Sequence, residues 1–146
     1  MTPCVRSSPR APSRASSSSS AAARSNAAGR SAGRADASLL LDVFHLYKSG
    51  TPFTALRQIN GASLHVIHLN DYPQAADSST LNDGNRIYPG DGVAPLRQIL
   101  RDLRDNGFRG HLSLELFNRE YWTRSADDNL KTAMEKIRAT VRSAMA

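Results

Sequence analysis

Three apolar segments of the sequence carry an acidic or imidazole side chain at or near their ends. Asp42 closes the first segment, His68 lies near the end of the second, and Glu115 lies within the third. His45 follows Asp42 by three residues, and Asp71 follows His68 by three. Two carboxylates and an imidazole suit Mn²⁺, Mg²⁺, Co²⁺ or Zn²⁺ better than copper or iron–sulfur chemistry. The alternatives are solvated strand ends that bind no ion and, for Glu115, a buried ion pair with an arginine.

Arg86 lies in a long polar segment, residues 70–92, just before the turn Gly90-Asp91-Gly92 that opens the next predicted helix. Glycines beside a helix N-terminus allow anionic oxygens to approach the backbone closely. An arginine at that place is suited to hold a sugar hydroxyl or a phosphate. Two glycines before a helix also serve simply as a turn, so this signal is weak by itself.

The other polar and aromatic side chains near these segments are expected to have structural or surface roles. His65 is out of phase with the site and is predicted to pack or to form hydrogen bonds. His111 begins its strand and is expected at the end opposite the site. Lys48, Tyr72 and Trp122 are expected at the surface.

Hydrophobic periodicity predicts the elements that position these residues. Apolar runs typical of buried strands cover 38–42, 64–69 and 111–117, and helical spacing covers 52–61, 93–103 and 126–144. The order β-α-β-α-β-α predicts a parallel α/β sheet with right-handed crossovers. Ligand sites in such folds lie at the carboxyl ends of the strands, where Asp42, His68 and Glu115 are placed.

The basic charge of the chain comes from its first 37 residues. This segment has six arginines, ten serines and ten alanines but one acidic residue, Asp36. It is predicted to be a disordered tail before a folded domain at 38–146, with a transit peptide or a nonspecific contact to acidic surfaces as alternatives. Since the remainder is nearly neutral, no specific nucleic-acid partner is expected.

No apolar run reaches the roughly 18 residues of a membrane span, so no membrane partner is expected. The single cysteine, Cys4, excludes a disulfide within the chain. The predicted location is the cytoplasm, with organelle import directed by the first 37 residues as a minor alternative.

Four motifs in this order resemble the sugar phosphate isomerase/epimerase family, whose members are xylose isomerase-like TIM barrels. The motifs are Asp42-Val-Phe-His45, His68-Leu-Asn-Asp71, Arg86-Ile-Tyr-Pro-Gly-Asp-Gly92 and Leu114-Glu115-Leu-Phe. The resemblance covers about residues 37–146 and implies a partial (β/α)₈ TIM barrel, made of about the last three βα units.

The resemblance also implies roles for particular residues. Asp42, His68 and Glu115 match three metal ligands, while His45 and Arg86 match residues that contact the substrate. Glu115 also matches one of two catalytic glutamates that move a proton on and off carbon. The implied substrate is a sugar or sugar phosphate, and the implied reaction is proton abstraction α to a carbonyl, through an enediolate that a divalent metal ion stabilises.

The family's second glutamate has no counterpart in this sequence, so weak or absent activity is expected for this polypeptide alone. One alternative is an inactive barrel fragment or binding module that self-associates through uncovered sheet edges. A less favoured alternative is a zinc nuclease of the endonuclease IV type. That nuclease has Asp-Arg-His where this chain has Asn85-Arg86-Ile87, and neither Asn nor Ile replaces those metal ligands well.

Overall fold

A computed structural model describes residues 37–146 of the 146-residue chain. The predicted tail, apart from Ala37, lies outside the described residues, as do the targeting alternatives attached to it. Within the described part, no helix is both long enough and apolar enough to cross a bilayer.

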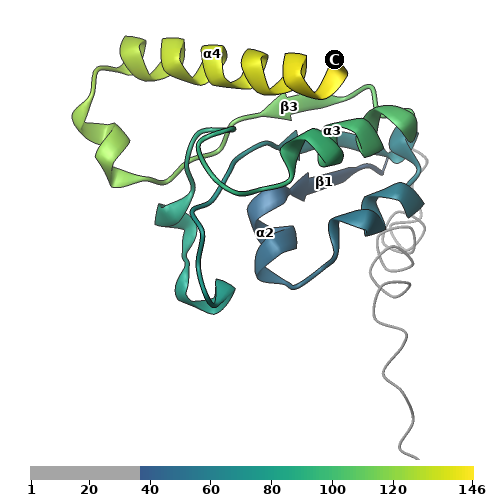
Figure 1. The fold of residues 1–146 in the computed structure, drawn as a ribbon. Helices are drawn as coiled ribbons and strands as arrows, with labels where there is room; N and C mark the ends of the chain where they lie inside the picture. Colours follow the sequence, from purple (N-terminus) through teal and green to yellow (C-terminus); the bar gives the residue numbers. More distant parts are fainter. Residues whose placement is uncertain (1–36) are drawn as a thin grey trace, which may run out of the picture.

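The described residues contain a parallel three-stranded sheet with the strands in chain order (Figure 1). The strands are β1 (Leu39–Asp42), β2 (Leu64–His68) and β3 (His111–Ser113). Their order and direction confirm the prediction, but β3 is shorter than the predicted 111–117. Beyond Ser113 the neighbouring strand β2 has ended, and no described strand lies on the other side of β3, so residues 114–117 have no ladder to join.

The long helices agree closely with the sequence pattern. They are α3 (Leu96–Asp105) and α4 (Ala126–Met145), where predictions placed 93–103 and 126–144. The predicted helix at 52–61 was wrong in type, because Phe53–Gln58 forms the 3₁₀ helix η1. Pro52 provides no side-chain cap to that segment, and six residues are too few for a stable uncapped α-helix.

Short elements occupy the remaining connections. The helix α2 (Val43–Lys48) was not predicted; it begins directly after β1, where the Asp42 side chain caps its first turn. The other elements are the 3₁₀ turns η2 (Gly61–Ser63), η3 (Ser78–Thr80), η4 (Asp83–Asn85) and η5 (Arg119–Thr123). The turns η3 and η4 belong to the long polar segment 70–92, which is otherwise a loop, as predicted.

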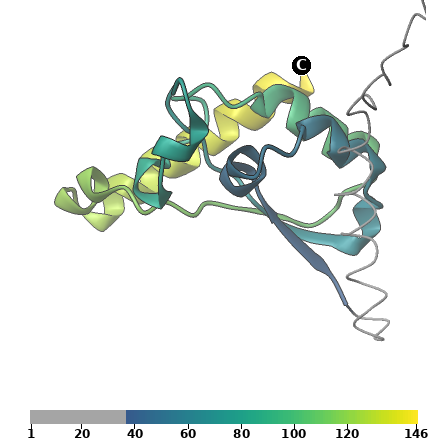
Figure 2. The same cartoon turned by 90° about the horizontal axis from the view of Figure 1, so that it is seen from below.

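The apolar core lies between one face of the sheet and the helices. Ile67 and Leu69 are buried in one apolar cluster with Ile99 and Leu103 of α3, which packs against η1 and α4. Figure 2 shows the helices gathered on one side of the strands. On the other face Leu40 is 52% exposed, so the described residues leave that face uncovered. This arrangement is part of a barrel wall, with the helical layer outside and the open face inside.

Candidate metal centre

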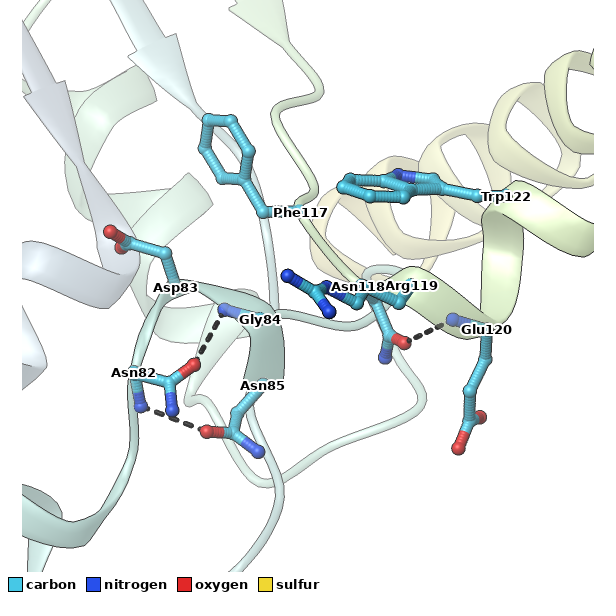
Figure 3. A pocket seen from close by; sticks show the side chains of 9 residues that line it. All are labelled: Asn82, Asp83, Gly84, Asn85, Phe117, Asn118, Arg119, Glu120 and Trp122. Carbon is cyan, nitrogen blue, oxygen red and sulfur yellow. Dashed lines mark hydrogen bonds between the residues drawn. The ribbon is translucent and has the colours of Figure 1, made fainter.

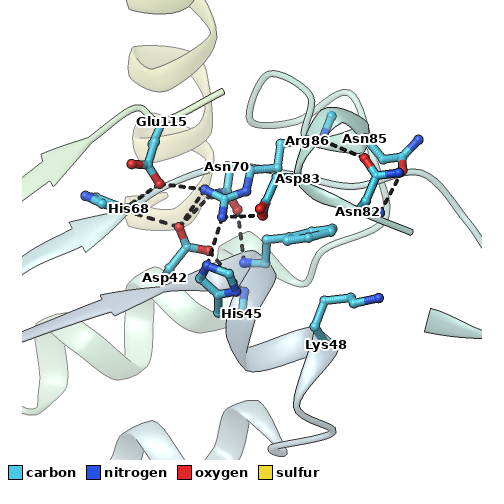
Figure 4. A network of polar contacts seen from close by, with 12 residues as sticks. Asp42, His45, Lys48, His68, Asn70, Asn82, Asp83, Asn85, Arg86 and Glu115 are labelled. Carbon is cyan, nitrogen blue, oxygen red and sulfur yellow. Dashed lines mark hydrogen bonds and ion pairs between the residues drawn. The ribbon is translucent and has the colours of Figure 1, made fainter. Parts of the chain in front are cut away.

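The three strands bring Asp42, His68 and Glu115 together at their carboxyl ends. One ligand atom from each residue lies within 4.8 Å of the other two. Asp42, His68 and Ser113 are register partners across the sheet, and Glu115 follows Ser113 by two residues, which returns it to the same face. Figure 4 shows the three side chains pointing toward one another. Three sequence-predicted residues therefore meet at one rim.

His68 forms a direct link between the two carboxylates. Its Nδ1 lies 3.3 Å from Asp42 Oδ2 and 3.1 Å from Glu115 Oε2. An ion held by the two carboxylates would therefore lie within reach of this imidazole as well.

Arg86 joins this cluster from the long loop. Its Nη1 donates to Asp42 Oδ2 at 3.0 Å and to Glu115 Oε2 at 2.7 Å. Its Nη2 donates to Asp83 Oδ1 at 2.8 Å and lies 3.0 Å from His45 Nε2. Since a guanidinium has donors only, His45 Nε2 must accept, which makes His45 neutral with its proton on Nδ1. The structure thus places both predicted substrate-contacting residues beside the predicted ligands.

The guanidinium of Arg86 is held on all sides and is almost inaccessible to solvent. The side chain is 1% exposed, and the guanidinium carbon lies 5.3 Å from the Phe44 ring centroid and 5.4 Å from that of Phe117. Such positions over aromatic faces favour a cation. The Nε atom is buried without a hydrogen-bond partner among the described residues.

The charge balance of this cluster suits a divalent cation. Three carboxylates, those of Asp42, Asp83 and Glu115, contact the single guanidinium of Arg86. With neutral histidines, two negative charges remain uncompensated. The oxygen and nitrogen donors of Asp42, His68 and Glu115 lie within 4.8 Å of one another, a mixed set that suits a divalent ion. The two uncompensated negative charges equal the charge that such an ion would bring.

Two residues that support the cluster were missed by the sequence reasoning. Asn70 is fully buried; its Nδ2 donates to Asp42 Oδ2 at 3.2 Å, and its Oδ1 accepts from the Phe44 backbone at 3.0 Å. Asp83 holds Arg86 from the opposite side of the guanidinium. Asn70 could have been found as a polar residue that directly follows an apolar strand. Asp83 could have been found as an acidic residue three positions before Arg86.

Asp71 organises the glycine turn instead of joining the cluster. Its Oδ2 accepts from the backbone amides of Gly90 and Gly92, each at 3.0 Å. Its Oδ1 accepts from those of Ala94 and Tyr72, at 2.9 and 2.8 Å. The turn does receive anionic oxygens, as its glycines suggested, but the carboxylate is the chain's own.

Tyr72 is buried, so its predicted surface role was wrong. It is 2% exposed and stacks on Tyr47 with ring centroids 3.9 Å apart. Burial, followed by the proximity of Tyr47 and Asp71, raises the pKa of Tyr72 to about 12. The aromatic pair fixes the start of the long loop next to α2.

The remaining predicted side chains divide between the surface and the loop. Trp122 is 66% exposed, as expected, and His111 begins β3 at the end away from Glu115. His65 is exposed and has no side-chain hydrogen bond within residues 37–146, contrary to its predicted packing role. Lys48 donates to backbone carbonyls at 78–81 and so braces the loop.

Comparisons with known proteins agree with this geometry. The family model described as xylose isomerase-like TIM barrel matches residues 26–140. Inosose isomerase of Bacillus velezensis is 33% identical over 109 residues, which cover 75% of this chain and 39% of that protein. Fructoselysine 3-epimerase of Escherichia coli O157:H7 is 29% identical over 77 residues, 53% of this chain and 26% of that one.

A solved structure shows the same arrangement of strands and helices. The crystal structure of the IolI protein with a bound zinc atom matches with a TM-score of 0.72 and 29% identity, over 77% of this chain and 40% of that chain. The chain thus spans less than half the length of these relatives. The family model matches most of the chain, and the solved structure shares its fold, so the chain can be assigned to a family. It belongs to the xylose isomerase-like TIM barrel family and forms part of such a barrel.

Proposed function

We propose that the described residues provide the metal-binding rim of a sugar isomerase or epimerase. The observation that carries the proposal is the convergence of Asp42, His68 and Glu115, whose ligand atoms lie within 4.8 Å of one another. The names of the relatives, an isomerase and an epimerase, support the reaction class. The proposed substrate is a sugar or sugar phosphate.

Asp42, His68 and Glu115 would hold the divalent ion. When bound, such an ion would polarise neighbouring carbonyl and hydroxyl oxygens of the sugar and stabilise the negative charge of an enediolate. Buried partners keep the ligand oxygens in place before any ion arrives, since Asn70 and Arg86 both donate to Asp42 Oδ2. The IolI structure contains zinc, and the proposal extends to the other divalent ions that suit these donors.

Glu115 is the proposed proton-transfer residue. Its side chain is 38% exposed, and its Oε2 is occupied by Arg86 and His68. Its Oε1 has no hydrogen bond within residues 37–146, which leaves that oxygen to take a proton from a carbon next to a carbonyl. Weak activity is proposed for this polypeptide alone, because the described residues leave the inner face of the sheet uncovered and place no second carboxylate across it.

His45 and Arg86 are proposed to act on the substrate oxygens. His45 is exposed, and since Arg86 engages its Nε2, its Nδ1–H is the group left to donate to a substrate hydroxyl. Arg86 is enclosed by carboxylates and rings, so its main contribution is to hold Asp42 and Glu115 in place. Its direct contact with substrate stays a prediction.

The nuclease alternative gains no support from the loop that distinguishes it. The Asn85 side chain accepts from the Asn82 backbone at 2.8 Å, within its own turn. Ile87 pairs its backbone with that of Asp71. Neither residue contacts the cluster in the described part of the chain. The inactive fragment or binding module, with self-association through its edges, remains the second candidate, favoured by the exposed Leu40.

Metal binding by the full chain tests the proposal. We expect calorimetric titration with Mn²⁺ to show one site, and Asp42→Asn and His68→Gln each to weaken it at least about tenfold. Asp105→Asn is the matched control, because Asp105 is 63% exposed and, within residues 37–146, pairs only with Arg104. Equal Mn²⁺ affinity in all four proteins would refute the site. Ketose epimerisation by the purified chain at about 1–10³ per second would refute the weak-activity clause.

A further inference from the structure

A pocket lies at the opposite end of the sheet from the metal centre. It has a volume of about 340 Å³ and is lined by the first residues of β2 and β3 and by the turns that precede them. The metal centre lies at the other ends of these strands, since His68 ends β2 and Glu115 follows the end of β3. The pocket is therefore separate from the proposed reaction site.

Close packing of the two turns fixes the shape of this pocket. The Gly61 amide donates to the Asn106 carbonyl at 3.2 Å. A Cβ on Gly61 would clash with the backbone of Asn106 and Phe108. A Cβ on Gly110 would clash with the His65 carbonyl. Because only glycine allows so close an approach, the backbones that carry the side chains of the pocket are held together before any ligand arrives.

The charged and titratable side chains of this lining are all basic. They are Arg109, His65 and His111, and no carboxylate among the described residues lines the pocket. On the neighbouring helix α3, Asp102 and Asp105 are each paired with another arginine. Arg109 therefore brings a positive charge that no ion pair within residues 37–146 compensates.

The pocket beside the metal centre has the opposite character. Asp83 and Glu120 line it together with a single exposed cation, Arg119 (Figure 3). It also adjoins the cluster around Arg86, in which the carboxylates outnumber the guanidinium by two. Without a bound cation, the charges of the described residues thus favour an anion at the amino-terminal ends of the strands and disfavour one at their carboxyl ends.

The three basic side chains leave most of their hydrogen-bond donors unused. Arg109 Nη1 donates to the Phe108 carbonyl at 2.9 Å, while its Nη2 and Nε have no partner within residues 37–146. The planar fork of a guanidinium can bind two oxygens of one oxyanion. His65 and His111 are exposed and have no side-chain hydrogen bond in the same range, so each imidazole keeps at least one N–H donor.

We propose that this pocket binds a tetrahedral oxyanion, a phosphate group. Arg109 binds two of its oxygens through the fork, and the imidazoles of His65 and His111 donate to the others. Donors from three side chains suit a group with four oxygens better than a carboxylate with two. The pocket is larger than one phosphate ion, so the group comes either from inorganic phosphate or from a small phosphate ester. The site shares no residue with the metal centre and does not rest on the proposed function.

The four histidines of the chain allow a direct test by nuclear magnetic resonance. His65 and His111 line the pocket, whereas His45 and His68 belong to the metal centre and serve as internal controls. The full chain is titrated with sodium phosphate, sn-glycerol 3-phosphate, sodium acetate and sodium chloride at matched ionic strength, while the imidazole C–H signals are followed. Single His→Gln variants assign the signals. We expect saturable shifts of the His65 and His111 signals with one or both phosphates, the tighter binder identifying the source of the group, and weaker binding of acetate and chloride.

Substitution of Arg109 tests the proposed contact. Arg109→Gln should weaken phosphate binding about tenfold or more, and Arg109→Lys less, because lysine keeps the charge but loses the fork. Arg109 is exposed, so both variants should keep the fold, which circular dichroism checks. Arg124→Gln is the matched control, since Arg124 is also exposed, lies over the Tyr121 ring and does not line the pocket. It should leave phosphate binding unchanged.

Four results would each overturn the inference. The first is that neither phosphate shifts the signals of His65 and His111. The second is that the saturable shifts occur at His45 and His68 instead. The third is that acetate or chloride binds as tightly as the phosphates. The last is that Arg109→Gln binds phosphate as tightly as the unaltered chain.

Discussion

Replacement of Arg86 by methionine should destabilise the fold strongly, because it removes the one cation from a group of three carboxylates. The side chain of Asp42 is 4% exposed, and loss of one partner from a buried pair costs about 3–5 kcal/mol. The side chains of Glu115 and Asp83 are 38% and 55% exposed, so water screens them and each adds no more than about 1 kcal/mol. A domain of this size has a stability of about 5–15 kcal/mol, so the loss is a large fraction of it.

Urea unfolding followed by far-ultraviolet circular dichroism measures this loss. Mn²⁺ should raise the unfolding free energy of Arg86→Met more than that of the unaltered chain, because the ion replaces the missing positive charge without competition from a guanidinium. Saturation at 100 times the dissociation constant contributes about 2.7 kcal/mol. Arg104→Met is the control: Arg104 is 49% exposed and forms a surface pair, worth less than about 1 kcal/mol. A loss below about 1 kcal/mol in Arg86→Met, or equal stabilisation of both proteins by Mn²⁺, would refute the reasoning.

Two further predictions concern the start and end of the long loop. Asp71→Ala leaves four backbone amides without their acceptor. We therefore expect urea unfolding to show a loss of about 2–5 kcal/mol in the free energy of unfolding, and the amides at 90–94 to exchange hydrogen faster. Unchanged protection of those amides would contradict the role given to Asp71. Tyr72 has a pKa of about 12 against an ordinary value of 10.0 for tyrosine, and the unfolded chain therefore loses the phenol proton first. Stability should be complete below pH 10 and fall as the pH rises from 10 to 12, and Tyr72→Phe should flatten this fall; an equal slope in both proteins would show that Tyr72 is not its source.

The sequence predicted the elements whose hydrophobic pattern is long and regular. The strands and the helices α3 and α4 have uninterrupted periods, and the structure moves their ends by no more than four residues, most of all at β3. The helix α2 was missed because its six residues are too few to show a helical period and because it follows β1 with no loop between them. The type of η1 depended on six residues without a cap, where propensity decides little.

The site residues likewise include some that the sequence could predict and some that it could not. The convergence of Asp42, His68 and Glu115 followed from a general rule, that carboxyl ends of parallel strands share one edge. The roles of Asn70 and Asp71 did not, because residue type reveals that a side chain is polar but not whether it turns toward the rim or toward a neighbouring backbone. Both questions are settled by contacts between segments about 20 residues or more apart.

Asp42 divides its two carboxylate oxygens between separate tasks. Oδ1 accepts from the backbone amide of His45, 3.0 Å away, whereas Oδ2 faces Arg86 and His68. The capping bond therefore ties the Asp42 carboxylate to the backbone of His45 at the first turn of α2. A rotation of Asp42 on ion uptake would lengthen that bond, so ion affinity and the backbone position of His45 are coupled at this residue.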